Sequence, residues 1–368
     1  MGAVALVDRG SGEPEVAVAG HHDLDRARSM ARDSIFRIAS LTKPMTAALV
    51  MTLVEEGRLR LDDPVARWLP EIAAPLVVRT PTSPVDDLVP VVRPITVEHL
   101  LTMTAGWGWA SDFEAPAVGV LADRIERQGE PHEPRTPDEW LRDLAAVPLL
   151  HQPGDAWLYN TCSDLQGVLV ARVLDRPLPD AFEERLLGPL AMADTGFAVP
   201  DTKAGRLAGM YRAGADGTLA ALAEPVGSYR ELPGFASGAG GLVSTVDDVH
   251  TFFRMIRGAG EVGGVRVLRP ETVRAMTTNQ ISVAQGEAAQ LFLDGQGWGY
   301  GGGVDVAAGE AWVVPGRYGW VGGTGTAGYV VPDSGVVSVL LTQRAMGGPD
   351  DAVLLGDFCT YAAERATG

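Results

Sequence analysis

A short stretch over residues 36–46 places a serine three positions before a lysine, at the predicted start of a long helix. Residues i and i+3 share one helical face, so the hydroxyl of Ser40 and the amine of Lys43 can meet. A serine hydroxyl is a poor nucleophile until a neighbouring group takes its proton. Burial favours the neutral form of an amine, which can accept that proton. The spacing therefore predicts a nucleophilic serine that is activated by a lysine.

The cations that this chain uses make the lysine informative. Of the 30 basic residues only two are lysines, Lys43 and Lys203, and the others are arginines. Arginine keeps its proton at any useful pH and cannot act as a base, whereas lysine can. In a chain with so few lysines, a lysine three positions after a serine therefore favours the interpretation that the lysine is catalytic. The competing interpretation is an ordinary helix start with a solvated lysine.

Composition and charge argue against several classes of partner. The 368 residues are 46% hydrophobic and 21% charged, which is enough for one large domain or two intertwined ones. The net charge of −17 argues against nucleic acid or an anionic membrane surface, because both require basic patches. No apolar run is long enough for a membrane span, and residues 1–9 read as a strand and not as a signal peptide. We therefore expect a cytoplasmic protein with a small-molecule partner, and no oligomeric state is predicted.

The sequence indicates neither a metal site nor a cofactor site. Cys162 and Cys359 lie too far apart along the chain to suggest a metal-binding pair or a disulfide framework. The six histidines lack the spacing of metal ligands. The glycines within 301–303 and 322–328 do not lead into a helix with a phosphate-binding pattern. We therefore expect no metal and no cofactor.

Hydrophobic periodicity predicts an α+β fold. Alternating segments at residues 3–7 and 15–19 flank a turn-rich stretch and predict a β-hairpin. Strand-like segments return after residue 297, and among them are residues 311–314, 326–331 and 335–342. Residues 72–94 lack periodicity and are predicted to be irregular. Helical spacing or capping residues predict helices over residues 41–56, 96–101, 136–146, 246–257 and 350–366. An antiparallel sheet assembled from both chain ends, with helices packed on it, is the expected layer arrangement.

A second informative stretch covers residues 153–167. A Pro-Gly turn leads into aromatic residues and Tyr159, and a predicted helix follows. A tyrosine just before a helix is often only a core residue whose hydroxyl has a partner. Its position alone therefore leaves both interpretations open.

Three segments now stand in one order: Ser40-x-x-Lys43, Tyr159, and the late Trp320-Val321-Gly322-Gly323. Together they resemble the serine β-lactamase and penicillin-binding-protein superfamily, and most of all the family VIII carboxylesterases and class C β-lactamases. The resemblance implies a β-lactamase-like α+β fold with an antiparallel sheet from both chain ends. It implies a sheet subdomain over residues 1–58 and 240–368, a mostly helical subdomain over 59–239, and an active site between them.

The resemblance also implies roles for individual residues. Ser40 would be the nucleophile, Lys43 the base or proton shuttle, and Tyr159 the partner base that passes a proton to the leaving group. The backbone N–H groups of Ser40 and Gly323 would form an oxyanion hole. Gly322 would lie beside this donor, where glycine allows a substrate to approach the backbone closely.

Two departures from the family pattern change the expected substrate. Lactamases carry Tyr-x-Asn, whereas Thr161 stands here where that asparagine would be. They also carry Lys-Thr-Gly on the late strand, whereas this chain has Trp320-Val321-Gly322. The missing lysine would hold a substrate carboxylate, so Trp320 favours a neutral or apolar substrate and hence an ester. The loop over residues 107–135 is expected to wall the pocket, with Trp107 as a candidate lining residue.

These observations predict a serine hydrolase that cleaves small carboxylic esters through an acyl-enzyme intermediate. The alternatives within the same fold are a β-lactamase, a D-amino-acid amidase or peptidase, and a transacylase. A further possibility, from a different class, is a non-catalytic sensor of the penicillin-binding type. The intact set of Ser40, Lys43 and Tyr159 argues against the sensor, which would have no need of the tyrosine.

Overall fold

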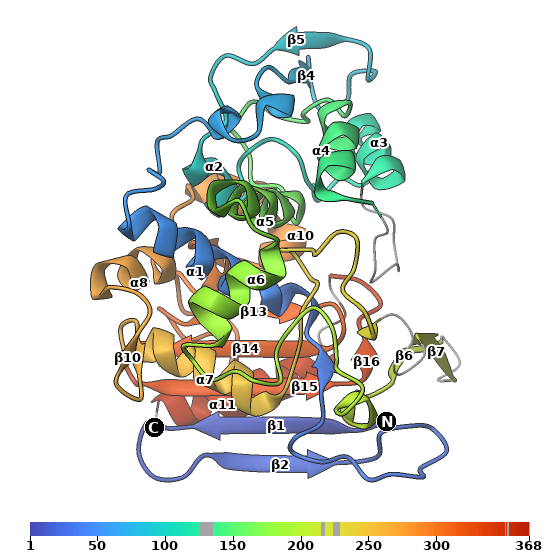
Figure 1. Cartoon of the computed structure of the whole chain (residues 1–368), viewed down its shortest axis with the longest axis vertical. Helices are drawn as coiled ribbons and strands as arrows, with labels where there is room; N and C mark the ends of the chain where they lie inside the picture. Colours follow the sequence, from blue (N-terminus) through green and yellow to red (C-terminus); the bar gives the residue numbers. More distant parts are fainter. Residues whose placement is uncertain (126–134, 215–217, 224–228, 350, 352, 368) are drawn as a thin grey trace.

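The computed structural model describes residues 1–125, 135–214, 218–223, 229–349, 351 and 353–367. Its centre is an antiparallel sheet of seven strands in the order β11-β12-β13-β14-β15-β1-β2 (Figure 1). These strands are β11 (Gly297–Trp298), β12 (Gly303–Val304), β13 (Tyr318–Gly322), β14 (Thr326–Val331), β15 (Val336–Thr342), β1 (Ala3–Asp8) and β2 (Glu15–Ala19). β1 pairs with β15 from Ala3 opposite Thr342 to Asp8 opposite Val337. The predicted α+β fold, with a sheet from both chain ends, is confirmed.

Strand β15 shows why the sheet is covered on both faces. All seven of its residues are buried, and its sequence is a nearly continuous apolar run instead of an alternating one. Val337, Val339 and Leu341 face the main core with α7 (Val246–Arg257), whereas Leu340 packs with residues of α11 (Val353–Thr367). Two helices therefore enclose the sheet, one on each face.

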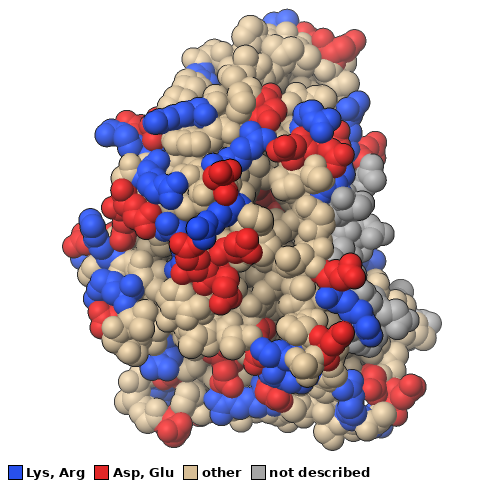
Figure 2. All heavy atoms as spheres, in the orientation of Figure 1, with Lys and Arg blue, Asp and Glu red and all other residues tan. Residues whose placement is uncertain are grey.

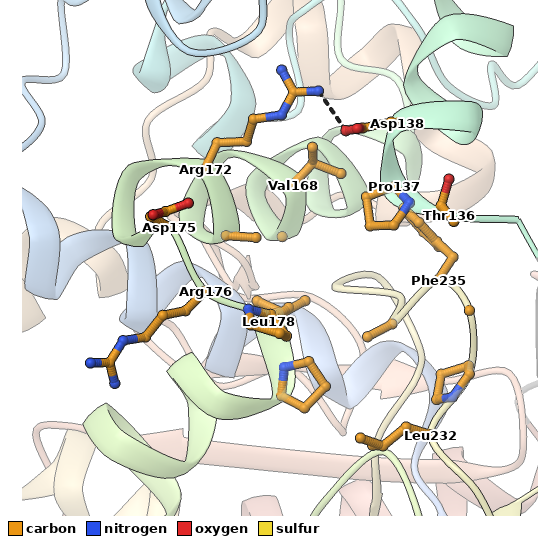
Figure 3. Close-up of a pocket in the computed structure, with 17 residues that line it drawn as sticks. Thr136, Pro137, Asp138, Val168, Arg172, Asp175, Arg176, Leu178, Leu232 and Phe235 are labelled. Atoms are coloured by element: carbon orange, nitrogen blue, oxygen red, sulfur yellow. Dashed lines mark hydrogen bonds and ion pairs between the residues drawn. The ribbon is translucent and has the colours of Figure 1, made fainter.

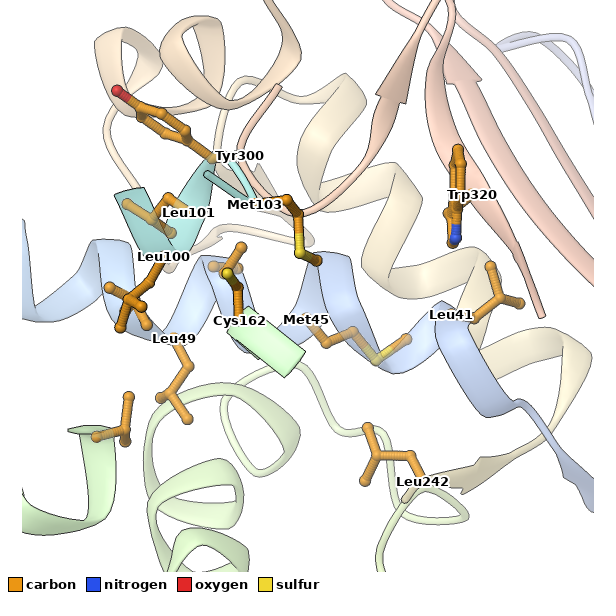
Figure 4. Close-up of a cluster of buried hydrophobic side chains, with 14 of the residues drawn as sticks. Leu41, Met45, Leu49, Leu100, Leu101, Met103, Cys162, Leu242, Tyr300 and Trp320 are labelled. Atoms are coloured by element: carbon orange, nitrogen blue, oxygen red, sulfur yellow. The ribbon is translucent and has the colours of Figure 1, made fainter. Parts of the chain in front are cut away.

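Helix α1 (Thr42–Glu55) is buried at the centre of the molecule (Figures 1 and 4). Every residue from Thr42 to Leu53 is buried, as expected of a helix that is apolar on all sides. Its side chains Met45 and Leu49 pack among residues of α2 (Val97–Leu101) and α5 (Thr161–Leu174) (Figure 4). The helix ends near Gly57, whose φ of 70° is left-handed.

The remaining elements are short and surround this core. The other helices are α3 (Pro116–Arg124), α4 (Pro137–Ala145), α6 (Leu178–Phe182), α8 (Pro270–Thr277), α9 (Val283–Ala288) and α10 (Gln290–Leu293). The other strands are β3 (Phe36–Arg37), β4 (Leu76–Val78), β5 (Leu88–Pro90), β6 (Met210–Ala213), β7 (Leu219–Ala223), β8 (Val243–Ser244), β9 (Glu261–Val262), β10 (Val265–Arg266) and β16 (Arg344–Ala345). Thr96, Thr136 and Thr245 each cap a helix with the side-chain oxygen.

Two predictions about elements are wrong. Residues 72–94 are not wholly irregular, because β4 and β5 form a small antiparallel pair there. The predicted strand at 311–314 is not a strand. Its end folds around Asp305, whose side chain accepts a hydrogen bond from Val314 N–H at 2.8 Å. That contact takes the backbone donor that a strand ladder would have used.

The surface mixes both signs of charge. Figure 2 shows basic and acidic side chains interspersed over the face that it displays. Among the described residues, no helix has the length and apolarity that crossing a bilayer requires.

Candidate active site

Ser40 and Lys43 meet as the spacing predicted, although the local structure differs slightly. Ser40 lies in a 3₁₀ turn (Ala39–Leu41) directly before α1, and not inside the α-helix. The Lys43 side chain is fully buried, and its Nζ donates to Ser40 Oγ at 2.8 Å. It also donates to Asn160 Oδ1 at 2.7 Å and to the Ala239 carbonyl at 2.8 Å. Three acceptors match the three N–H groups of an ammonium, so the amine is held in one position.

Asn160 is a site residue that the sequence interpretation missed. Its φ of 85° is rare for a residue other than glycine, and this conformation directly precedes α5. The amide of Asn160 thereby reaches Lys43, while Thr161 is buried as the first residue of α5. The asparagine of the lactamase pattern is thus one position earlier in this chain. Its place next to Tyr159 was the only signal in the sequence.

Asp164 lies behind the lysine and was also missed. Its Oδ1 accepts hydrogen bonds from Ser237 Oγ at 2.7 Å and from Ala239 N–H at 3.0 Å. Burial raises the pKa of the Asp164 carboxyl, and the hydrogen bonds and the charge of Lys43 oppose that rise. Because Asp164 fixes the turn that contains Ala239, it also fixes the carbonyl that binds Lys43.

Tyr159 faces this group from the start of α5. The Nζ of Lys43 lies 4.6 Å from the centre of the tyrosine ring. The hydroxyl oxygen accepts a hydrogen bond from Trp320 Nε1–H at 2.8 Å, and the ring of Phe292 stacks on it at 4.9 Å. Tryptophan is a donor only, so this contact leaves the tyrosine O–H proton free to point elsewhere.

The end of β13 is tied to the segment that carries Ser40. The Thr324 hydroxyl donates to the Arg37 carbonyl at 2.6 Å, and the Thr326 hydroxyl donates to the Ile38 carbonyl at 3.1 Å. Gly322 is buried against Ile38, and a Cβ there would collide with the Ile38 carbonyl. A Cβ on Gly323 would meet nothing within 4 Å, because Gly323 faces open space. Gly323 therefore borders the same cavity as Ser40.

That cavity has a volume of about 240 Å³. It brings together four predicted site residues, Ser40, Tyr159, Trp320 and Gly323, and none of its described lining residues is a lysine or an arginine. The remaining lining residues are Phe292, Val321, Met346, Gly347, Gly348 and Pro349. The sequence interpretation gave none of these six a role in the site, although Val321 lies within the late-strand motif.

Trp107 does not line this cavity, so that expectation fails. The side chain is 1% exposed, and its indole N–H donates to the Val147 carbonyl at 2.9 Å. An indole that finds a backbone acceptor inside the core has no reason to face a pocket. Part of the loop that was expected to wall the pocket, residues 126–134, lies outside the described residues.

A larger cavity of about 500 Å³ lies elsewhere, along α5 and the start of α6 (Figure 3). Val168, Leu178 and Phe235 contribute apolar surface, and Arg172 at its edge is paired with Asp138 at 2.8 Å. None of Ser40, Lys43 or Tyr159 lines it. The larger cavity is therefore separate from the candidate site around Ser40. The described residues also contain no group of three histidine, cysteine or acidic side chains that could hold a metal ion.

Comparisons with known proteins show which family the chain resembles in sequence. A sequence model of the Beta-lactamase family matches residues 1–356. The chain is 38% identical to protein Rv1367c of Mycobacterium tuberculosis (strain ATCC 25618 / H37Rv) over 353 residues, which is 93% of this chain and 86% of that protein. It is 33% identical to esterase EstB of Burkholderia gladioli over 371 residues, covering 95% of this chain and 88% of that protein.

A solved structure gives the same result. EstCE1, described as a hydrolase with promiscuous acyltransferase activity, superposes with a TM-score of 0.77 at 26% identity. The match covers 100% of this chain and 93% of that chain. The chain therefore belongs to the beta-lactamase family.

Proposed function

We propose that this protein is a serine hydrolase that cleaves uncharged carboxylic esters through an acyl-enzyme intermediate. The observation that carries the proposal is the contact of 2.8 Å between Lys43 Nζ and Ser40 Oγ, at the edge of a cavity that Tyr159 also lines. A nucleophile within hydrogen-bond reach of a base, with a further group holding the base in place, is the arrangement that activates a serine. Asn160 and Ala239 are the groups that hold Lys43.

The first half-reaction follows from these positions. Lys43 acts as the neutral amine, whose two N–H groups can still serve Asn160 and Ala239. Ser40 Oγ attacks the ester carbonyl carbon and passes its hydroxyl proton to Lys43 Nζ. The N–H groups of Ser40 and Gly323 stabilise the oxyanion, each donor contributing about 3 kcal/mol to the transition state. The C–O bond to the alcohol then breaks, and Tyr159 gives its proton to the leaving alkoxide oxygen. The proton held by Lys43 restores the tyrosine, and the acyl group remains on Ser40.

In the second half-reaction water attacks the acyl carbonyl. One water proton passes to the Lys43–Tyr159 pair and returns to Ser40 Oγ as the bond to the serine breaks, and the acid is released. By microscopic reversibility the same groups serve both halves.

The lining of the cavity supports an uncharged substrate. A β-lactam or a peptide carboxylate needs a cation, and the described lining residues supply none. Trp320 stands where the resemblance places a lysine, and its indole donates to Tyr159. An indole supplies the hydrogen bond to the tyrosine without adding a charge.

Transacylation is a second candidate, favoured by the likeness to EstCE1, which is described as having promiscuous acyltransferase activity. An alcohol that replaces water in the second half-reaction would give a new ester in place of an acid. The same acyl-enzyme serves both outcomes.

The test compares p-nitrophenyl butyrate, nitrocefin and a D-alanine amide on the wild type and on Ser40→Ala. We expect ester turnover with a burst of one equivalent in the wild type, and none above background in the variant. A fluorophosphonate should label Ser40. Ester turnover that survives in Ser40→Ala would overturn the proposal, and faster turnover of nitrocefin than of the ester would replace it with a β-lactamase.

A further inference from the structure

A second, smaller chamber adjoins the cavity at Ser40. Its volume is about 140 Å³. The two spaces share five lining residues: Phe292, Trp320, Val321, Met346 and Pro349. The lining found in the smaller chamber alone is Asp294, Gln296, Trp312, Tyr329, Leu355, Gly356 and Cys359. We call this space the side chamber.

The side chamber lies where the sheet is incomplete. β12 pairs only with Tyr318 and Gly319 of β13, so the following residues of β13 have no described strand on that side. Leu355, Gly356 and Cys359 of α11 contribute to the chamber from the outer layer of the fold. A space bounded by a short strand and a helix is thus left beside the catalytic serine.

This space is largely apolar, and Asp294 is the one acidic residue in its described lining. Most of its lining is aromatic or aliphatic. A cation beside the chamber wall, Arg317, is ion-paired with Asp305 at 2.9 Å and lies 4.3 Å from the ring centre of Tyr329, so it is already engaged. Gln296 donates to Asp305 at 2.6 Å. A ligand with a carboxylate or a phosphate would find no partner among these residues, and Asp294 would repel it.

The chamber lies on the leaving-group side of Ser40. Its shared walls Phe292 and Trp320 both contact Tyr159, the first by stacking and the second by the hydrogen bond at 2.8 Å. In the proposed mechanism Tyr159 protonates the leaving oxygen, so the alcohol part of the ester must lie next to that phenol. Phe292 and Trp320, which contact the phenol, thus also line the chamber.

We propose that the side chamber binds the alcohol part of the ester and selects uncharged primary alcohols with a short alkyl chain. At about 30 Å³ for each water-sized group, 140 Å³ holds about four or five heavy atoms. This inference rests on the proposed function and assigns the specificity of the same site.

Gly356 offers a direct way to close the chamber. A Cβ at this helical glycine would meet nothing within 4 Å, so Gly356→Leu can fill the space without a backbone clash. Gly119→Leu is the matched control, because Gly119 is an exposed glycine of α3 whose added Cβ also meets nothing within 4 Å. Thermal unfolding shows whether both variants fold.

The assay follows acid release from acetates of methanol, ethanol, 1-butanol and 1-hexanol, and separately from methyl acetate, methyl butyrate and methyl hexanoate, in which the alcohol part stays the same and small. In the wild type and Gly119→Leu we expect kcat/KM to rise about fourfold for each methylene of the alcohol, up to about four or five carbons. In Gly356→Leu this rise should vanish, while methyl acetate and the acyl series stay within about twofold of the wild type.

The outcomes separate the two proposals. If alkyl acetates turn over at rates that do not depend on the alcohol, or if Gly356→Leu changes the acyl series and spares the alcohol series, the chamber assignment is overturned and the proposed function stands. If no ester turns over above the Ser40→Ala background, the proposed function fails and this inference fails with it. Should Gly356→Leu not fold, the alcohol series of the wild type still decides the matter.

Discussion

The two sides of the site are held together by different kinds of contact. Around Lys43 the contacts are directional hydrogen bonds of 2.7–3.0 Å that join Ser40, Asn160, Ala239 and Asp164. The opposite wall, with Phe292, Trp320 and Met346, consists largely of packed rings and apolar side chains. One directional bond, from Trp320 to Tyr159, crosses between the two.

In the proposed mechanism, the polar side carries the proton transfers and the apolar wall selects among ester substrates. Proton transfer depends on heavy atoms held at hydrogen-bond distance, so the polar side tolerates little change. An apolar wall discriminates by shape, and one methylene more or less changes the discrimination by only about 10- to 200-fold. Substitutions on the polar side should therefore lower the rate on every ester, whereas those in the wall should change the preference among esters.

The strongest test of the polar side is Lys43→Arg. Arginine keeps the charge and can reach the same acceptors, but it cannot give up a proton at a useful pH. We expect kcat/KM for p-nitrophenyl butyrate to fall by about 10³-fold or more, near the upper part of the range for general acid–base catalysis. A variant that keeps more than about a tenth of the activity would contradict a proton-accepting role.

Tyr159→Phe tests the group that stands between the two sides. The ring can still stack on Phe292, but the proton donor to the leaving oxygen is lost. We expect kcat to fall by about 10²-fold, with a smaller change in KM, and thermal unfolding should show an intact fold. Wild-type rates in this variant would make Tyr159 a core residue only.

Trp320→Phe removes the hydrogen bond that the Trp320 side chain donates to Tyr159 and keeps an aromatic ring there. The Tyr159 oxygen loses a donor at 2.8 Å. Since a neutral hydrogen bond contributes about 1 kcal/mol, kcat should fall by about fivefold to tenfold. A loss as large as that of Tyr159→Phe would place Trp320 among the groups that the chemistry requires, and the contrast between the two sides would break.

Asp164→Asn should have the smallest effect on rate and a characteristic effect on stability. Burial raises the pKa of this carboxyl, so its contribution to folding is present at low pH and is lost as the pH rises through the folded value. Asparagine keeps an acceptor oxygen for Ser237 and Ala239 and has no such proton. The Tm of the variant relative to the wild type should therefore rise as the pH increases above about 4, the ordinary value for an aspartate. A Tm difference that does not vary with pH would contradict this assignment.

From the residues alone, the sequence predicted contacts and elements whose residues lie close together along the chain. The contact of Ser40 with Lys43 could be predicted because both lie within one turn, and the β-hairpin could be predicted because alternation is a local signal. Tyr159 and Gly323 came from the resemblance, and the structure places both at the cavity of Ser40.

What could not be predicted depends on contacts that a local pattern does not encode. Asn160 reaches Lys43 through a backbone conformation that is rare for its residue type. Phe292 lies in the short helix α10 and Met346 directly follows β16, so no periodicity links them to Ser40. Trp107 was wrongly expected in the pocket because the sequence does not show that the Val147 carbonyl would accept its indole N–H.

The two threonine hydroxyls that tie β13 and β14 to Arg37 and Ile38 have a consequence for biosynthesis. A nascent chain carries Ser40 and Lys43 soon after synthesis begins, yet it does not contain Gly323, which is an oxyanion donor in the proposed mechanism. Strand β1 also cannot pair until its partner β15, near the other end of the sequence, has been synthesised. Ser40 and Lys43 are therefore synthesised long before the other groups of the proposed site. An unfinished polypeptide contains the serine but cannot yet form the complete site around it.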